Sequence, residues 1–276
     1  MKVKGLKFTV IRNAYIWNDL SWNLGMHTIA GVSNPEPKGK FIRSIILSFL
    51  VYHPELGYFL YDTGLSRIDA ETRTEYQKEY FPIETADDLY IDKQLEKLGL
   101  NVNDINFVIA SHLHWDHIDG IEMFQGTKAI KNIYTSHAEL QNGLMYTHGA
   151  GPKAPGDPIY CKRVLDNPEL EYHFVDEDCE LFPGVHLFGM TGHTPGGLAM
   201  MLECEHQNYI FPGDSVFRHE QFQIPPIPSG LVADTLGFNK SVEKLYRIRE
   251  KYNAKMIYSH DPIDFETYKQ VPDFYD

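Results

Sequence analysis

The strongest constraint on what this chain can fold into is a set of four metal-capable side chains within six residues. They lie in residues 112–117, His-Leu-His-Trp-Asp-His, directly after a short apolar segment of strand length. Side chains two apart in an extended segment point to the same face, so His112 and His114 can bind one ion from a strand end. As the backbone turns, Asp116 and His117 can reach a second ion. Histidines clustered by chance are the ordinary alternative, but this density favours a metal site.

Three later segments supply further ligands, each where an apolar, strand-like run ends. His193 lies in residues 192–197, Gly-His-Thr-Pro-Gly-Gly, and Asp214 follows Phe-Pro-Gly. His260 follows Tyr-Ser and precedes Asp-Pro. Any one of them alone would be read as an ordinary turn residue. Together with the first cluster they place ligands at four strand ends, which predicts a shared metal centre.

The ligand chemistry points to a divalent transition metal. Imidazole and carboxylate suit Zn²⁺, and also Mn²⁺, Fe²⁺ or Co²⁺, and the lack of cysteine in the cluster argues against a purely structural zinc. The three cysteines, Cys161, Cys179 and Cys204, are odd in number and widely spaced. They support neither a disulfide framework nor a zinc-knuckle pattern, and a reducing cytoplasm fits them best.

Strand-like and helix-like segments alternate along the chain, which favours a layered α/β fold. No second core is evident, so we expect one domain over residues 1–276. We expect an irregular loop or short helix at 64–87 and a long surface loop at 146–158. The expected strands are 7–17, 41–53, 58–61, 106–110, 132–135, 185–190, 198–203, 208–211 and 255–258. The expected helices are 88–98, 118–124, 137–144 and 242–252.

Charge and hydropathy narrow the class of partner. The formal net charge of −13 would repel phosphate backbones and anionic lipid, so nucleic acid and membrane surfaces are poor partners and a nuclease is disfavoured. The most apolar run, residues 45–52, is far shorter than the roughly 20 residues that cross a bilayer. The first residues lack the pattern of a signal peptide. These features predict a cytoplasmic protein that acts on a small molecule.

The ligand pattern resembles a known family in order and local context. The seven residues resemble the ligand set of the metallo-β-lactamase superfamily, and Asp62-Thr63-Gly64 is similar to another motif of that family. The length and the ending at 259–268 resemble the N-acyl homoserine lactonase branch. The resemblance implies a four-layer αββα sandwich with two zinc ions. It implies one ion on His112, His114 and His193, another on Asp116, His117 and His260, and Asp214 bridging both.

One position departs from the pattern of that branch. Its lactonases usually carry, three residues after the bridging aspartate, a tyrosine that contacts the substrate carbonyl, and here the residue is Phe217. A phenyl ring cannot donate a hydrogen bond to the oxygen that gains charge. Either another donor serves, with Tyr146, Tyr160 and His219 as candidates, or the substrate is not an acyl homoserine lactone.

The residues and the resemblance together predict a lactone-opening hydrolase. Two cations sharing Asp214 would share a hydroxide that attacks the carbonyl carbon, and Asp116 would also pass the proton to the leaving oxygen. Substrate selection would come from aromatic-rich loops, which can equally form a homodimer contact. These loops are 16–37, 64–87, 146–158 and 217–228.

Other functions fit the same ligands. Within the family they include a glyoxalase II-like thioesterase, a γ-butyrolactone or pyridoxolactone lactonase, and a β-lactamase. An iron-dependent oxidoreductase of the same fold is a different class, and a protein that binds metals without turnover is a third. The full set of seven ligands favours two metals and hydrolysis, although ligands alone do not fix the metal.

Overall fold

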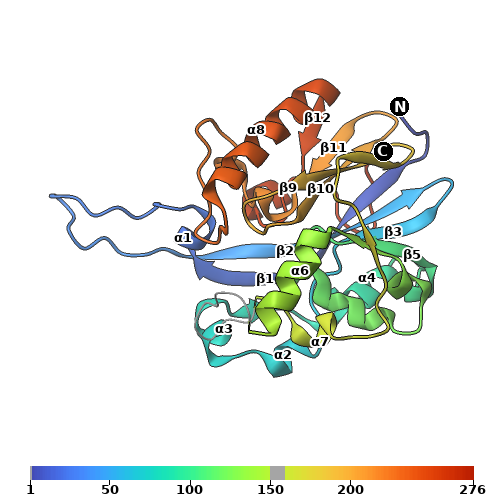
Figure 1. Ribbon diagram of the computed structural model, residues 1–276, viewed down its shortest axis with the longest axis horizontal. Helices are drawn as coiled ribbons and strands as arrows, with labels where there is room; N and C mark the ends of the chain where they lie inside the picture. Colours follow the sequence, from blue (N-terminus) through green and yellow to red (C-terminus); the bar gives the residue numbers. More distant parts are fainter. Residues whose placement is uncertain (1, 150–158) are drawn as a thin grey trace.

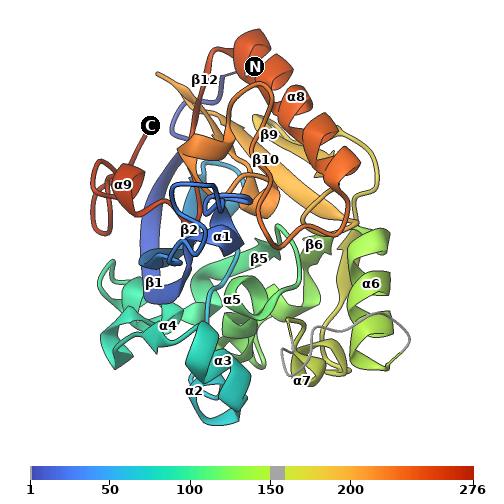
Figure 2. The ribbon, with the colours of Figure 1, turned by 90° about the vertical axis from the view of Figure 1, so that its left-hand side faces the viewer.

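Two β-sheets pack face to face between helices in the computed structural model, which describes residues 2–149 and 159–276 (Figures 1 and 2). The first sheet has seven strands in the order β4-β1-β2-β3-β5-β6-β7, and the second has five in the order β12-β11-β10-β9-β8. Helix α8 covers the outer face of the second sheet, while α4, α6 and α7 lie beyond the first (Figure 1). The expected four-layer α/β sandwich is confirmed.

The strands are β1 (Lys7–Asp19), β2 (Phe41–His53), β3 (Gly57–Tyr61), β4 (Ile83–Glu84), β5 (Ile105–Ile109), β6 (Ile133–Thr135), β7 (Tyr172–Phe174), β8 (Cys179–Phe182), β9 (Val185–Met190), β10 (Gly197–Glu203), β11 (Asn208–Phe211) and β12 (Ala254–Met256). The α-helices are α1 (Leu20–Asn23), α2 (Asp69–Thr72), α3 (Glu75–Tyr80), α4 (Ile91–Glu96), α5 (Trp115–Ile118), α6 (His137–Thr147), α7 (Lys162–Leu165), α8 (Thr235–Tyr252) and α9 (Pro262–Phe265). None of the helices in the described part of the chain has the length and apolarity needed to cross a bilayer.

The first sheet is apolar on both faces because both are covered. In β2, Leu47 and Phe49 point into the core shared with the second sheet, whereas Leu50 packs toward α4 on the outside. Strands β1 to β3 pair antiparallel, and β3, β5, β6 and β7 pair parallel. The parallel arrangement places the residues that follow β3 and β5 at the same edge of the sheet.

Helix α8 buries its apolar face on the second sheet. Phe238, Val242 and Leu245 pack against residues of β10 and β11. The helix begins seven residues before the expected start at 242, because the Asp234 side chain accepts a hydrogen bond from Leu236 N and caps it there. It ends at Asn253, which adopts a left-handed conformation with φ of 46°.

Four expected segments differ in detail from the structure. The helix expected at 118–124 is present as a 3₁₀ helix, η3 (Asp119–Phe124), which follows α5 directly, and not as an α-helix. The segment 88–98 divides into a 3₁₀ turn, η1 (Asp87–Leu89), and helix α4. The segment 64–87 is more regular than expected, since it contains α2, α3 and β4. At 146–158, α6 continues through Thr147, and residues 150–158 lie outside the described part of the chain.

The loop between α1 and β2 projects from the body of the molecule (Figure 1). Its side chains Met26, Ile29 and Val32 are exposed by 79%, 64% and 106%. Trp22 and Asn23, in α1 just before this loop, instead line the cavity described below. Segment 16–37 was expected to contribute to substrate selection, and the part of it that reaches the cavity is therefore its beginning.

Candidate metal centre

All seven expected ligands meet at one edge of the sandwich, where the ends of both sheets come together. The first sheet supplies the segment after β5, which carries His112, His114, Asp116 and His117. The second sheet supplies His193 after β9, Asp214 after β11 and His260 after β12. The structure brings these side chains together, and they form three groups that could hold a metal ion.

One group consists of His112, His114 and His193, with one nitrogen of each within 4.8 Å of the others. His193 Nε2 lies 3.0 Å from His114 Nδ1, and His112 Nε2 is buried with no hydrogen-bond partner. Burial lowers the pKa of His112 and His114 well below 6.5, and the neighbouring imidazoles lower them further. These rings are therefore neutral, which is the form that binds a metal.

The other group consists of Asp116, His117 and His260. His260 Nε2 lies 3.3 Å from His117 Nε2, and Asp116 Oδ2 lies 3.8 Å from each of these nitrogens. Burial lowers the pKa of His117, but the carboxylates of Asp214, Asp116 and Asp62 together raise it well above 6.5. Negative charge around this pair of imidazoles is thus strong enough to attract a proton or a cation.

Asp214 lies between the two groups and turns one oxygen toward each. Its Oδ2 is 3.4 Å from His193 Nε2 and 3.9 Å from His112 Nε2. Its Oδ1 is 3.2 Å from His117 Nε2 and 3.1 Å from His260 Nε2. Burial raises the pKa of this carboxyl, but the charges of His260 and His117 lower it well below 3.8 overall. An ionised carboxylate with this orientation is suited to bridging two cations.

The donor set fits divalent metals. Pairs of imidazole nitrogens that face each other at 3.0 and 3.3 Å direct their lone pairs into the same space, an arrangement that a cation stabilises. His112 Nε2 is buried and has no hydrogen-bond partner among the described residues, as expected of a nitrogen that binds a metal ion. Because all the donors are nitrogen and oxygen, Zn²⁺, Mn²⁺, Fe²⁺ and Co²⁺ remain suitable.

Asp62, in the turn after β3, fixes the orientation of His117. Its Oδ2 lies 2.8 Å from His117 Nδ1 and accepts from Ser111 Oγ at 2.8 Å, and its Oδ1 accepts from Ser111 N at 2.7 Å. Asp62 has a φ of 61°, an unusual value for a residue other than glycine. A carboxylate at Nδ1 places the proton there and leaves His117 Nε2 as the ligating atom. The motif at residues 62–64 therefore supports an expected ligand from behind and does not line the cavity.

Glu139, in α6, supports the first group and was not predicted from the sequence. Its Oε1 accepts from the backbone N of Leu113, between two expected ligands, at 3.0 Å. The same oxygen accepts from Tyr160 Oη at 3.0 Å, and Tyr160 packs edge-on against the His114 ring. The motif Ser-x-x-Glu that starts at Ser136 is typical of a helix cap and conceals this role. Ser136 does cap the helix, but the carboxylate turns inward.

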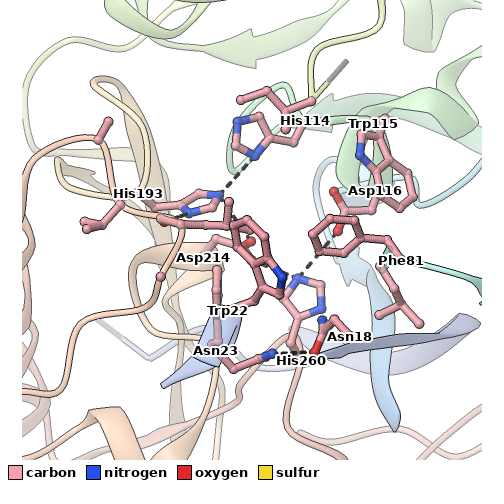
Figure 3. Close-up of a pocket in the computed structure, with 17 residues that line it drawn as sticks. Asn18, Trp22, Asn23, Phe81, His114, Trp115, Asp116, His193, Asp214 and His260 are labelled. Carbon is pink, nitrogen blue, oxygen red and sulfur yellow. Dashed lines mark hydrogen bonds and ion pairs between the residues drawn. The ribbon is translucent and has the colours of Figure 1, made fainter. Parts of the chain in front are cut away.

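A cavity of about 280 Å³ opens over Asp116, His193, Asp214 and His260 (Figure 3). Phe217 forms part of its wall, with its ring edge-on to His193 at 5.1 Å and to His260 at 5.4 Å between centroids. The remaining lining is mostly aromatic and aliphatic, with two asparagines among it. These residues are Ile16, Asn18, Trp22, Asn23, Phe81, His114, Trp115, Ile159, Gly230, Leu231, Val232 and Ala233.

The candidate donors proposed to compensate for Phe217 do not line this cavity. Tyr160 Oη donates to Glu139 and accepts from Asn142 Nδ2 at 2.8 Å, so it is fully engaged. Tyr146 packs against Tyr160. His219 Nδ1 lies 2.6 Å from Asp261 Oδ2. None of the three therefore presents a donor at the cavity wall, although the Tyr160 ring packs against His114.

Residues 43–260 match the family model of the metallo-beta-lactamase superfamily, a stretch that includes every expected ligand. The chain belongs to this superfamily. Membership explains why the two sheets and the four strand ends are arranged as they are, and it confirms the resemblance that the ligand order indicated. Membership also makes a metal-dependent reaction the chemistry to expect at this cavity.

Known members of the superfamily that the chain is similar to include several lactonases. It is 25% identical over 238 residues to the N-acyl homoserine lactonase AttM of Rhizobium radiobacter, covering 82% of this chain and 86% of the relative. It is 24% identical to the N-acyl homoserine lactonase AiiB of Agrobacterium fabrum, covering 99% and 100%. An N-acyl homoserine lactone hydrolase with N-hexanoyl-L-homoserine at its metal centre shares the fold, with a TM-score of 0.80, 22% identity and full coverage of both chains.

Proposed function

We propose that this member of the superfamily is a dinuclear-metal lactonase whose substrate is an N-acyl homoserine lactone. The observation that carries the proposal is Asp214, which turns one oxygen toward each of two nitrogen-rich groups at the base of an apolar cavity. One cation would be held by His112, His114 and His193, and the other by Asp116, His117 and His260.

The residues around the cations would each have a defined task. Two divalent cations would supply the Lewis acidity that lowers the pKa of water and polarises an ester carbonyl. Asp214 would hold the two groups in register, and Asp62 would keep His117 Nδ1 protonated so that Nε2 faces the metal. The aromatic wall would exclude bulk water and strengthen the electrostatic interactions.

Asp116 is the best placed carboxylate to move a proton. It lines the cavity, and at 3.8 Å from His117 and His260 its Oδ2 is less engaged than the oxygens of Asp214. Ring opening adds a hydroxyl to the carbonyl carbon, breaks the ring C–O bond and leaves an alkoxide that needs a proton. Asp116 would take up the proton that the attacking water loses and pass it to this oxygen, which completes the ring-opened hydroxy acid.

The substrate class is supported by the shape and charge of the cavity and by the relatives. An opening lined by aromatic and aliphatic side chains suits a small neutral ring with an apolar tail. The net charge of −13 does not disfavour a neutral ligand. The relatives AttM and AiiB are both named N-acyl homoserine lactonases.

The test is ring opening, followed as proton release, by protein whose metal content has been measured. Substrates are acyl homoserine lactones of several chain lengths, γ-butyrolactone and a thioester. The control variants are His112→Ala, which removes an expected ligand, and His206→Ala, which removes an exposed histidine that pairs with Asp276. We expect the lactones to open and only His112→Ala to lose activity.

Other outcomes would redirect the assignment. Two bound metals without acyl homoserine lactone hydrolysis would remove that substrate. Preferred cleavage of the thioester would favour a glyoxalase II-like enzyme instead. A single bound iron with no hydrolysis would favour the oxidoreductase alternative.

A further inference from the structure

Two asparagines form a buried polar pair in the otherwise apolar part of the cavity wall. Asn18 and Asn23 are exposed by only 7% and 3%, and both line the cavity that holds Asp116, Asp214 and His260. Asn23 Nδ2 donates to Asn18 Oδ1 at 2.7 Å (Figure 3). This pair is the polar feature of the wall that the metal centre does not use.

The pair is brought together by the turn from β1 into α1. Asn18 is the penultimate residue of β1, and Asn23 is the last residue of α1. Between them, Asp19 caps the short helix by accepting from Ser21 N at 2.8 Å, which returns the chain toward the strand. The turn therefore directs both amides to the same side, beside Trp22, which also lines the cavity.

The single shared hydrogen bond leaves much of the pair's capacity unused. Each amide has two N–H hydrogens and one carbonyl oxygen, so whichever way round the two amides lie, each keeps at least one N–H, and one oxygen remains. Within residues 2–149 and 159–276, no protein group bonds these remaining atoms. Because both side chains line the cavity, a ligand bound there can reach these free atoms and take the place of water.

We propose that Asn18 and Asn23 bind the secondary amide of the substrate, and so select lactones that carry an amide over lactones that do not. A secondary amide offers one N–H and one carbonyl oxygen, which complement the acceptor and donors that the pair leaves free. The proposal rests on the proposed lactonase function. The metal centre would act on the ring, while the pair would hold the amide beside it.

Selectivity of this kind is large because a buried polar group left unpaired disfavours binding of the wrong ligand. We therefore expect Asn18→Leu and Asn23→Ala to lower kcat/KM for N-hexanoyl homoserine lactone by about 10- to 100-fold, mainly through KM. The same variants should change kcat/KM for a γ-butyrolactone with an alkyl chain at the same ring carbon by less than about 3-fold.

The matched control is Asn142→Leu. Asn142 also donates a side-chain hydrogen bond, to Tyr160 at 2.8 Å, but it does not line the cavity. It should leave the ratio between the two substrates unchanged. An equal loss on both substrates in the Asn18 and Asn23 variants, or no loss on either, would overturn the proposal.

A binding measurement separates this proposal from the proposed function. Trp22 and Trp115 line the cavity, so ligands can be titrated by tryptophan fluorescence on metal-loaded protein without turnover. The probes are N-hexylacetamide and nonan-2-one, which has the same length and carbonyl but no N–H. If the wild type opens no lactone, the proposed function fails. Tighter binding of the amide that Asn18→Leu abolishes would still support the pair's role, and equal binding of both probes would overturn it.

Discussion

Replacing Asp62 by asparagine tests whether the orientation of one imidazole controls the second metal group. In the wild type, Asp62 Oδ2 faces His117 Nδ1 and Ser111 Oγ, both at 2.8 Å. Asparagine can keep an oxygen for Ser111 N, but it then presents an N–H to His117 Nδ1. His117 would have to accept at Nδ1 and carry its proton on Nε2, the atom 3.2 Å from Asp214.

The expected effect follows from the loss of a free Nε2 lone pair. Removing a partner that orients a ligating histidine typically weakens metal binding by about 10- to 100-fold. That range corresponds to about 1.4–2.8 kcal/mol. Among the described residues, Ser111 links Asp62 to the group of His112, His114 and His193, because its hydroxyl lies 3.0 Å from His112 Nδ1. One of two metals should therefore be lost much more readily than the other.

The measurement is competition for zinc against a chromophoric chelator, with the metal content determined after dialysis. Asp62→Asn should show two separated affinities, and its metal content should fall toward one equivalent at free zinc concentrations that saturate the wild type. Tyr246→Phe is the control, because it removes a hydroxyl that donates to Phe222 O at 2.7 Å, outside the network of Asp62, Ser111 and His117. Wild-type affinity for two metals in Asp62→Asn would refute the argument from the tautomer.

Two further predictions concern Phe217 and His219. Phe217→Tyr should raise kcat on acyl homoserine lactones by up to about 100-fold, because it adds a donor beside His193 and His260; an unchanged kcat would mean that the carbonyl already has a donor. Partial burial lowers the pKa of His219, but Asp261 raises it by more, so the pKa lies above 6.5. The ion pair should therefore stabilise the fold fully below pH 6.5 and lose its effect as the pH rises through the raised pKa. Because the ring is 42% exposed, solvent screening limits this term to less than about 1 kcal/mol. His219→Gln should abolish that dependence in urea unfolding measured from pH 5 to 9, and an unaltered profile would contradict it.

The expected ligands could be read from the sequence because metal binding demands particular residue types at strand ends. His112 and His114 follow from the alternation of side chains in an extended chain, and the four strand ends could be recognised by their apolar runs. The supporting residues carry no such pattern. Glu139 lies in a Ser-x-x-Glu motif that predicts a helix cap, and only the packing of α6 beside residue 113 turns its carboxylate toward the ligand loop.

Local conformation was least predictable where tertiary contacts override intrinsic preference. Apolar periodicity predicted a helix at 118–124, but Gly120 packs so close to the backbone of Thr63 that a Cβ there would lie 2.2 Å from Thr63 O. The chain adopts a 3₁₀ helix at this contact in place of an α-helix. The pair of Asn18 and Asn23 could not be predicted for a similar reason. In the sequence, two asparagines five residues apart indicate a turn, and it is the fold that places both side chains in one wall.

The seven expected ligands come from both sheets, which links the geometry of the site to the packing of the fold. Four expected ligands come from the first sheet and three from the second, so the only place where all seven can meet is the edge shared by both sheets. Metals bound there would join the two layers of the sandwich, and their binding free energy would add to the stability of the fold. The buried groups that orient the ligands, Asp62 and Glu139, come from different elements of the first sheet and its helices. A change in how those elements pack would therefore alter the positions of the expected metal ligands.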